Sequence, residues 1–391
     1  MFSRALSKTF DRFLKFPVIG VFGPRQSGKT TLVKEFFPAY KYVNLEDPNV
    51  RSFALENPQG FLHTFENEHG IIIDEFQYVP QILSYIQLIV DTKDRPGYFI
   101  LTGSQNFLMN EAVTQSLAGR IGILTLLPMA IKELGDNSLL TNDICKLIFT
   151  GSYPRLYAKG IAPLDVYPAY IQSYIERDVR LLVNVENLST FQRFMQLCAA
   201  RVGQQLNVAE LATQCGIAQK TVNSWLSVLE ASYIIYLLHP YYKNFNKRVT
   251  KTPKLYFYDT GLVCSLLNIR SSEELALSSF KGSLFECLII TDLFKQYFNR
   301  GAKAALYYWR DLNGRIEVDC LIDHGIRLIP VEIKSSDTIK PEYFDGLNKF
   351  SELSDAAQQD KYVVYAGLHK QARAAGNIVG WQDAGSLIDV I

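Results

Sequence analysis

Eight consecutive residues near the start of the chain have the types and spacing of a loop that binds the phosphates of a nucleotide. They read Gly23-Pro24-Arg25-Gln26-Ser27-Gly28-Lys29-Thr30 and match the pattern GxxxxGK[ST] in full. In such a loop, consecutive backbone N–H groups curve around the phosphate oxygens at the positive end of a helix. Lys29 then meets the β- and γ-phosphates, and the Thr30 hydroxyl binds Mg²⁺. These residues, with Thr31 after them, predict a site for ATP and Mg²⁺.

An apolar run that ends in two acids supplies the second half of this chemistry. Ile71 to Ile73 are followed directly by Asp74 and Glu75. The pattern predicts that Asp74 joins the Mg²⁺ shell and that Glu75 polarises the attacking water, so ATP would be hydrolysed as well as bound. The alternative is that both acids merely cap the next helix. The loop upstream favours the catalytic interpretation.

Two more polar residues are candidates for the same site. Ser104, or Gln105 after it, ends another strand-like run and could contact the γ-phosphate or the water, although ordinary turn chemistry explains it equally well. Arg120 precedes a further apolar run and could act as an arginine finger in the site of a neighbouring subunit. A lone arginine is more often a partner in a surface salt bridge.

The elements that must position these residues follow an alternating pattern. Short apolar runs alternate with helical stretches such as Gln81 to Asp91, which favours a buried parallel sheet with helices on both faces. The runs are Pro17 to Phe22, Tyr40 to Leu45, Gly70 to Ile73, Tyr98 to Leu101 and Ile121 to Leu127, and a helix is expected at Thr30 to Phe37. The basic, amphipathic residues 1–16 look like a transit peptide, but we expect a helix packed on the first domain.

The middle of the chain predicts a helical lid and then a winged helix. Pro128 to Val185 is helical in pattern, with a break at Gly151-Ser152-Tyr153-Pro154. Val208 to Gln214 and Ala218 to Ser232 resemble a helix-turn-helix. Strands at Tyr233 to His239 and Leu255 to Tyr258 would flank a wing.

This winged helix carries basic and aromatic side chains suited to DNA. The wing holds Tyr241, Tyr242, Lys243, Phe245, Lys247, Arg248, Lys251 and Lys254, and the second helix offers Lys220, Thr221, Asn223 and Ser224 off its apolar stripe. Basic groups neutralise phosphates and aromatic rings stack on bases. Winged helices also serve as protein-docking or structural modules, and that alternative stays open.

The last third of the chain contains a pattern of metal-dependent nucleases. Glu332 and Lys334 lie two apart on a predicted strand, and Asp319 lies on the preceding strand of the same hairpin, as in the PD-(D/E)xK arrangement. Asp319 and Glu332 would hold Mg²⁺, Lys334 would orient water, and Glu286 from the preceding helix would complete the cluster. Charged alternation on an exposed hairpin face is the competing explanation.

Composition bounds the class of protein. With 391 residues the chain should form two to four modules, and 48% hydrophobic against 20% charged residues indicates a folded, soluble protein. With a net charge of +1, the chain lacks the overall positive charge that would attract nucleic acid, so any such binding must come from a local patch. Six scattered cysteines without a CxxC pair argue against a zinc site and favour a reducing cytoplasm, and no apolar run approaches the ~20 residues of a membrane span.

The chain resembles the AAA+ ATPases, and more closely a prokaryotic group whose C-terminal part is a nuclease-like domain of unknown function (type 4143). The resemblance rests on the phosphate loop and on Ile73-Asp74-Glu75, Leu101-Thr102-Gly103-Ser104, Leu117-Ala118-Gly119-Arg120, Gly151-Ser152-Tyr153-Pro154-Arg155, Phe257-Tyr258-Asp259-Thr260-Gly261-Leu262, Trp309-Arg310 and Glu317-Val318-Asp319. It implies that Arg120 is a finger, that Arg155 is a lid arginine sensing the nucleotide, and that the protein forms a homo-oligomer.

Together these patterns predict an α/β ATPase core at residues 1–127, a helical lid at 128–190, a winged helix at 191–279 and a restriction-endonuclease-like domain at 280–391. The leading hypothesis is a cytoplasmic Mg²⁺-dependent ATPase that couples hydrolysis to DNA binding or processing. The alternative is a nucleotide-controlled switch that binds a protein partner and carries an inactive nuclease-like domain.

Overall fold

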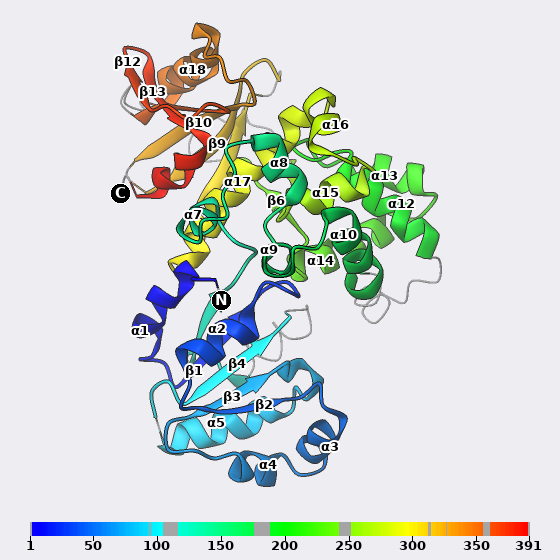
Figure 1. Ribbon diagram of the computed structural model, residues 1–391, viewed down its shortest axis with the longest axis vertical. Coiled ribbons are helices and arrows are strands. Elements are labelled where there is room, and N and C mark those ends of the chain that lie inside the picture. Colours follow the sequence, from blue (N-terminus) through cyan, green and yellow to red (C-terminus); the bar gives the residue numbers. More distant parts are fainter. Residues whose placement is uncertain are drawn as a thin grey trace. The chain divides into compact units, whose positions relative to one another are not determined.

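The computed structural model describes residues 2–93, 95–104, 116–175, 188–241, 252–311, 314–325, 327–354 and 360–389 (Figure 1). The chain forms two compact units. The first unit comprises Met1–Met129, Ser227–Tyr233 and Phe298–Ala302, and the second comprises Ala130–Leu226, Ile234–Tyr297 and Lys303–Ile391. The finer division into lid, winged helix and nuclease-like domain stays a prediction.

A five-stranded parallel sheet forms the centre of the first unit. Its strands are β1 (Val18–Phe22), β2 (Lys41–Asn44), β3 (Ile71–Asp74), β4 (Phe99–Gly103) and β5 (Ile121–Thr125), in the order β2-β3-β4-β1-β5. Every pairing is parallel. The five strands expected from the apolar runs are thus confirmed. Since β1 lies inside the sheet, the loop that follows it has a strand end on either side.

Helices cover both faces of this sheet (Figure 1), as the alternating pattern predicts. One face packs α3 (Pro48–Glu56), α4 (Pro58–Thr64) and α5 (Ile82–Lys93), and the other packs η1 (Ala5–Thr9), α1 (Phe10–Phe13) and α2 (Lys29–Phe36). Along β1, Val18 and Phe22 enter the first core and Ile19 and Val21 enter the second. A fully buried side chain of this size stabilises the fold by about 1.5–3 kcal/mol.

The N-terminal segment packs on the first unit, as expected from its amphipathic pattern. Leu6 and Phe10 are fully buried in the core beside α2. Arg4 is only 7% exposed, and its guanidinium donates to Ser27 O at 2.7 Å and to Leu127 O at 2.6 Å. This arginine therefore holds the phosphate loop to the chain that follows β5.

The second unit begins with helices and has two helices joined by a turn at the positions where the helix-turn-helix is expected. Its elements up to the hairpin are α7 (Ile131–Asp136), α8 (Ile144–Thr150), α9 (Pro154–Lys159), α10 (Pro163–Tyr170), the π-helical turn η3 (Ile171–Ile175), α12 (Leu188–Ala199), α13 (Val208–Cys215), most of α14 (Gln219–Ala231), β6 (Ile235–Leu238) and β7 (Lys254–Phe257). Left-handed Gly216 ends α13, and β6 and β7 pair antiparallel. The helices and strands predicted for the described residues of this region are confirmed as elements, whereas residues 176–187, which include the predicted end of the helical stretch at Val185, lie outside the described residues.

A six-stranded mixed sheet completes the second unit. The remaining elements are α15 (Thr260–Leu266), α16 (Ser272–Leu277), α17 (Lys281–Asn299), β8 (Leu306–Arg310), β9 (Glu317–Asp323), β10 (Leu328–Lys334), η4 (Pro341–Phe344), α18 (Asp345–Ser354), β11 (Tyr362–Tyr365), β12 (Gln371–Arg373), β13 (Gly376–Gly380) and η6 (Trp381–Ile388). The strand order is β12-β13-β11-β10-β9-β8. The helix and the three strands expected after Phe280 are confirmed, and three further strands extend the sheet beyond them.

None of the helices in the described ranges is long and apolar enough to cross a membrane. All six cysteines are buried and free of disulfide bonds.

Candidate nucleotide site and a C-terminal acidic cluster

The phosphate loop connects β1 to α2, and Lys29 is the first residue of that helix. The Lys29 side chain is buried, and its ammonium donates to Gly23 O at 3.0 Å and to Pro24 O at 2.8 Å. Burial lowers the pKa of Lys29, while the carboxylates of Glu75 and Asp74 oppose that shift. The cation is thus held inside the loop by carbonyl groups that are weaker partners than a phosphate.

The backbone of the loop leaves polar groups ready for a ligand. A Cβ at Gly23 would lie 2.1 Å from Leu126 O, so only glycine fits there. Gln26 adopts a left-handed φ of 64°, a conformation that persists only where the surroundings enforce it. Ser27 Oγ and Gln26 Oε1 are buried without a hydrogen-bond partner among the described residues. Unsatisfied buried groups are costly, and bound phosphate with its water shell would satisfy them. The loop therefore fits the phosphates of a nucleotide.

Asp74 stands at the end of β3 and accepts hydrogen bonds from three hydroxyl groups. Its Oδ2 accepts from Thr30 Oγ1 at 2.8 Å and from Tyr42 at 2.8 Å, and its Oδ1 accepts from Thr102. Thr30 and Asp74 are thus adjacent, which is the oxygen pair that would hold Mg²⁺. Sequence reasoning missed Tyr42 and Thr102, which lie on β2 and β4, the strands on either side of β3.

Glu75 follows directly and adopts a left-handed φ of 54°. Its Oε2 accepts a hydrogen bond from Gln77, and the same amide nitrogen lies 3.3 Å from Ser104 Oγ. The backbone N–H of Ser104 is 3.5 Å from Glu75 Oε2. Ser104 therefore lies beside Glu75, as the sensor hypothesis requires, whereas Gln105 lies outside the described residues. Gln77 was not predicted, and its position two residues after Glu75 was the available signal.

The other predicted nucleotide residues occupy less constrained positions. Thr31 is exposed on α2, and Arg25 lies 3.9 Å from Glu46. Arg120 forms a two-pronged ion pair with Asp91 of α5, with Nε–Oδ1 and Nη2–Oδ2 distances of 2.5 and 3.0 Å. Arg155, at the start of α9, is exposed. The finger and lid roles of the two arginines stay predictions.

Comparison with known proteins agrees with this geometry. Residues 15–135, which contain the loop, Asp74 and Glu75, match a family model described as an AAA domain. The first unit contains an AAA-type P-loop domain. Beyond the AAA domain, residues 141–273 and 281–383 match two domains of unknown function, DUF8612 and DUF4143. The predicted combination of a P-loop ATPase domain with a C-terminal DUF4143 domain is confirmed.

Sequence similarity to relatives extends beyond the AAA domain. The uncharacterized protein Rv2008c of Mycobacterium tuberculosis is 28% identical over 358 residues, which is 90% of this chain and 77% of the relative. The uncharacterized protein MJ1637 of Methanocaldococcus jannaschii is 23% identical, over 67% of this chain and 65% of its own. A Walker-type ATPase of Pyrococcus abyssi aligns with a TM-score of 0.46 at 15% identity, over 68% of this chain and 96% of its own.

The predicted nuclease residues gather in the second unit, with two partners that the sequence did not indicate. Asp319 on β9 accepts from the backbone N–H of Ile333 at 2.8 Å, and Lys334 Nζ lies 2.5 Å from Glu332 and 3.9 Å from Asp319. Lys254 at the start of β7 lies 3.2 Å from Glu286 of α17 and also pairs with Glu317 of β9. We call Glu286, Glu317, Asp319, Glu332, Lys254, Lys334 and Arg310 the acidic cluster.

Burial controls the charges of this cluster. It raises the pKa of Glu286 to about 7 and that of Glu332 to about 8, with Asp319 adding to both shifts and the paired lysines opposing them. Burial alone would lower the pKa of Lys254, but Glu286 and its acidic neighbours outweigh it, and the pKa is raised. Lys254 is therefore a permanent cation.

As they stand, the cluster's carboxylates do not fit a metal ion. Across the described part of the chain, no group of three or more His, Cys, Asp or Glu residues is placed to hold one. The cluster's carboxylates are also paired with cations of the chain: Lys254 contacts Glu286 and Glu317, and Lys334 contacts Asp319 and Glu332. Three acids expected as ligands are thus already paired with ammonium groups.

The residues proposed for DNA contact divide between surface and interior. On α14, Lys220 and Asn223 are exposed and Thr221 and Ser224 half-buried. The wing residues from Tyr242 to Lys251 lie outside the described residues. Lys254 and Tyr241 are buried, the first by its ion pairs and the second in the core around Trp309, so neither is available to DNA as the wing hypothesis supposed.

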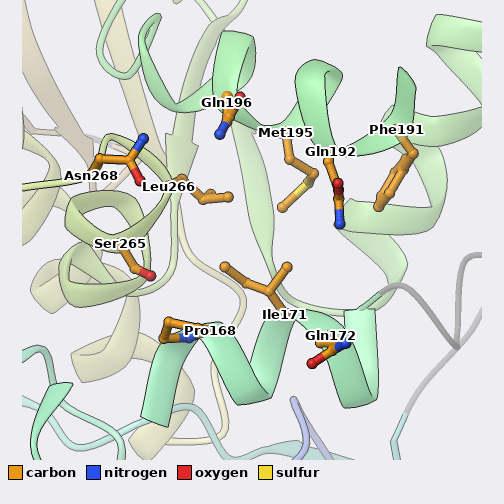
Figure 2. A pocket seen from close by; sticks show the side chains of 10 residues that line it. All are labelled: Pro168, Ile171, Gln172, Phe191, Gln192, Met195, Gln196, Ser265, Leu266 and Asn268. Carbon is orange, nitrogen blue, oxygen red and sulfur yellow. The ribbon is translucent and has the colours of Figure 1, made fainter. Parts of the chain in front are cut away.

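The second unit also contains a pocket of about 380 Å³ between α10, η3, α12 and α15. Figure 2 shows Ile171, Met195 and Leu266 extending into it from three sides. The described lining contains four side-chain amides and one hydroxyl but no charged side chain, and consists of Pro168, Ile171, Gln172, Phe191, Gln192, Met195, Gln196, Ser265, Leu266 and Asn268. It offers no group that could do acid–base chemistry.

Proposed function

We propose that this chain is a Mg²⁺-dependent ATPase whose turnover drives or controls the engagement of DNA. The observation that carries the ATPase part is the Thr30–Asp74 contact of 2.8 Å, formed next to Glu75 and directly behind the phosphate loop. In this proposal the loop amides and Lys29 bind the phosphates, and Thr30 and Asp74 hold the metal. Mg²⁺ would neutralise the charge that develops on the phosphates. Glu75 orients and deprotonates the attacking water.

Two substitutions test the assignment. Lys29→Ala should abolish ATP binding, because the cation that meets the β- and γ-phosphates is gone. Glu75→Gln should keep ATP binding and lower turnover by roughly 10²–10⁴-fold, the usual contribution of a positioned base. Steady-state phosphate release and calorimetry measure the two effects, and Glu35→Gln, at an exposed position of α2, is the matched control. Parental turnover in Glu75→Gln would refute the role of Glu75.

The DNA part is supported by the helix-turn-helix of α13 and α14 and by the polar residues exposed on α14. We expect double-stranded DNA to bind with an affinity that falls steeply with salt, since phosphate contacts release counterions. Lys220→Ala should weaken that binding and reduce the salt slope by about one. Lys159→Ala, at an exposed lysine of α9, should leave it unchanged. ATPase rates with and without DNA then test the coupling.

A second candidate function is a nucleotide-controlled switch that binds a protein partner and has no nuclease activity. The pairing of Lys254 with Glu286 and Glu317 favours it, because those contacts compete with a catalytic metal. ATP hydrolysis without salt-dependent DNA binding would support this candidate over the first. Metal-dependent cleavage stays a sequence prediction. If it occurs, Asp319→Ala and Lys334→Ala should both abolish it.

A further inference from the structure

Gln77 belongs to a tight turn that directly follows β3. Glu75 adopts a left-handed backbone conformation, and the 3-10 turn η2 (Phe76–Tyr78) begins immediately after it. Phe76 is fully buried, with its ring centre 5.8 Å from that of Phe22 at the end of β1. The backbone around Gln77 is therefore anchored to the strand that leads into the phosphate loop.

The amide of Gln77 joins the two polar side chains expected near the γ-phosphate. Its nitrogen, Nε2, donates to Glu75 Oε2 and to Ser104 Oγ, the latter at 3.3 Å. An ionised carboxylate only accepts hydrogen bonds, so the nitrogen and not the oxygen of the amide faces Glu75. The two hydrogens of the amide nitrogen are thus used by residues that directly follow β3 and β4.

The oxygen of the same amide is in a different situation. Gln77 Oε1 is buried and has no hydrogen-bond partner among the described residues. A buried acceptor without a partner is unfavourable, so it indicates a donor that the complete site receives. In the part of the chain that the structure describes, the hydrogen bonds to the Glu75 carboxylate both go to Oε2, from Gln77 and from Ser104 N. Gln77 Oε1 and Glu75 Oε1 are thus two acceptors for one small molecule that donates twice.

We propose that Gln77 positions the attacking water together with Glu75. This inference rests on the proposed ATPase function. The water donates one hydrogen to Gln77 Oε1 and the other to Glu75, which directs a lone pair at the γ-phosphorus. The water oxygen then bonds to that phosphorus, the proton moves to Glu75, and the bond to the β,γ-bridging oxygen breaks, with its electron pair leaving on ADP. An amide suits this task because it accepts a hydrogen bond without competing for the proton.

Gln77→Met tests the proposal, because it keeps the length of the side chain and removes both polar atoms. Steady-state phosphate release gives kcat and KM, and calorimetry with a non-hydrolysable ATP analogue gives Kd. We expect kcat to fall roughly 10²-fold, the effect of a misplaced reacting group, while Kd stays within about twofold because Gln77 contacts the water and not the phosphates. Gln81→Met, at an exposed glutamine, is the matched control and should keep the parental values. If Gln77→Met does not fold, Gln77→Glu replaces it, since this variant keeps the shape of the side chain and loses the donor to Glu75.

A double variant separates water positioning from general support of the fold. When Gln77 acts through the water that Glu75 activates, adding Gln77→Met to Glu75→Gln lowers kcat by less than about threefold further, because residues that act as a unit are not additive. Full additivity, a Kd that rises as much as kcat falls, or parental kcat in the single variant would each overturn the proposal. Absence of ATP hydrolysis by the parental protein would overturn the proposed function, and this inference with it.

Discussion

Asp74 owes its position to hydroxyl groups contributed by three separate elements. Thr30 comes from α2, Tyr42 from β2 and Thr102 from β4. Hydrogen bonds of this kind fix the orientation of a metal-binding carboxylate, and their loss typically lowers metal affinity by about 10–100-fold. Tyr42 is therefore expected to matter for Mg²⁺ although it would not touch the ion.

Tyr42→Phe should raise the Mg²⁺ concentration for half-maximal ATPase activity by about tenfold and change the maximal rate less, because only the orientation of Asp74 is loosened. Tyr40→Phe is the matched control, since the Tyr40 hydroxyl donates to Gly97 O at 3.1 Å instead. Magnesium titrations of ATPase activity measure both. An unchanged half-saturation in Tyr42→Phe would show that Asp74 is held without it.

Glu332 gives the protein a specific pH dependence. Its pKa is raised from 4.5 to about 8 by burial and by Asp319, and its Oε2 is buried without a described hydrogen-bond partner. Between these two values the folded protein keeps a proton that the unfolded chain has released. The stability from this proton is fully present below pH 4.5 and is lost as the pH rises through about 8, at about 1.4 kcal/mol per pH unit.

Glu332→Gln removes this titration, so its stability relative to the parental protein should increase from about pH 5 to about pH 8. Denaturant unfolding followed by circular dichroism at both pH values measures the difference. Glu342→Gln, at an exposed glutamate, gives the baseline for exchanging glutamate for glutamine. A relative stability of Glu332→Gln that falls or stays constant with pH would contradict the expectation.

For individual residues, the sequence predicts those that belong to a short motif with a known chemical role. Lys29, Thr30, Asp74 and Glu75 belong to two such patterns and lie together as expected. Their supporting partners come from segments far along the chain. Lys254 shows where prediction from local sequence fails. Because it lies in a basic stretch, the sequence predicted a DNA contact. In the folded chain it is buried against the carboxylates of Glu286 and Glu317, which are 32 and 63 residues away.

Among the elements, one buried carboxylate explains two of the sequence phrases on which the family resemblance rests. Asp259, the N-cap of α15, accepts from Ser152 N at 2.7 Å, Ser152 Oγ at 3.0 Å and the Tyr167 hydroxyl at 2.6 Å. It thereby joins the turn between α8 and α9 to the start of α15 and to α10. At that turn, almost no space is left for a side chain at position 151, which is Gly151.

Gly151→Ala should destabilise the second unit by at least about 3 kcal/mol, because φ is +72° and the new Cβ would lie 1.9 Å from the Tyr167 hydroxyl oxygen. Gly160→Ala is the matched control, with φ at +61° and no atom within 4 Å of the new Cβ. It should cost only about 1–2 kcal/mol. Denaturant midpoints compare the two, and equal losses would mean that the turn relaxes around the methyl group.

Element prediction succeeded for the strands of the first sheet and missed β11, β12 and β13 of the second. β1, β3 and β4 are buried along their whole length and therefore read as uninterrupted apolar segments. β12 is a three-residue edge strand with every side chain exposed, so no hydrophobic pattern marks it. β11 pairs with β10 and β13, and β13 also pairs with β12. These pairings join segments that no sequence pattern connects.

For the whole molecule, Arg120 is the residue that would link ATP hydrolysis to the predicted homo-oligomer. It is paired with Asp91 of its own chain, so a finger role in a neighbouring site requires that pair to break. An exposed ion pair is worth about 0–1 kcal/mol, which an oligomer interface easily replaces.

Arg120→Ala should lower ATP turnover by roughly 10³-fold if the arginine acts as a finger, and parental turnover should rise with protein concentration. Asp91→Ala breaks the same ion pair but leaves the guanidinium in place, so it should keep full activity. Phosphate release at several protein concentrations measures the effect. Equal activities of the two variants would confine Arg120 to its surface ion pair.

The contact of Arg4 with Ser27 O and Leu127 O has a practical consequence for anyone who expresses this protein. A shortened version of the protein that starts at Ala5 would lack Arg4 and with it both of these hydrogen bonds to the phosphate loop and to the chain after β5. We expect the shortened protein to bind nucleotide more weakly than the full chain. A loss of activity in it should therefore not be assigned to the residues of the phosphate loop itself.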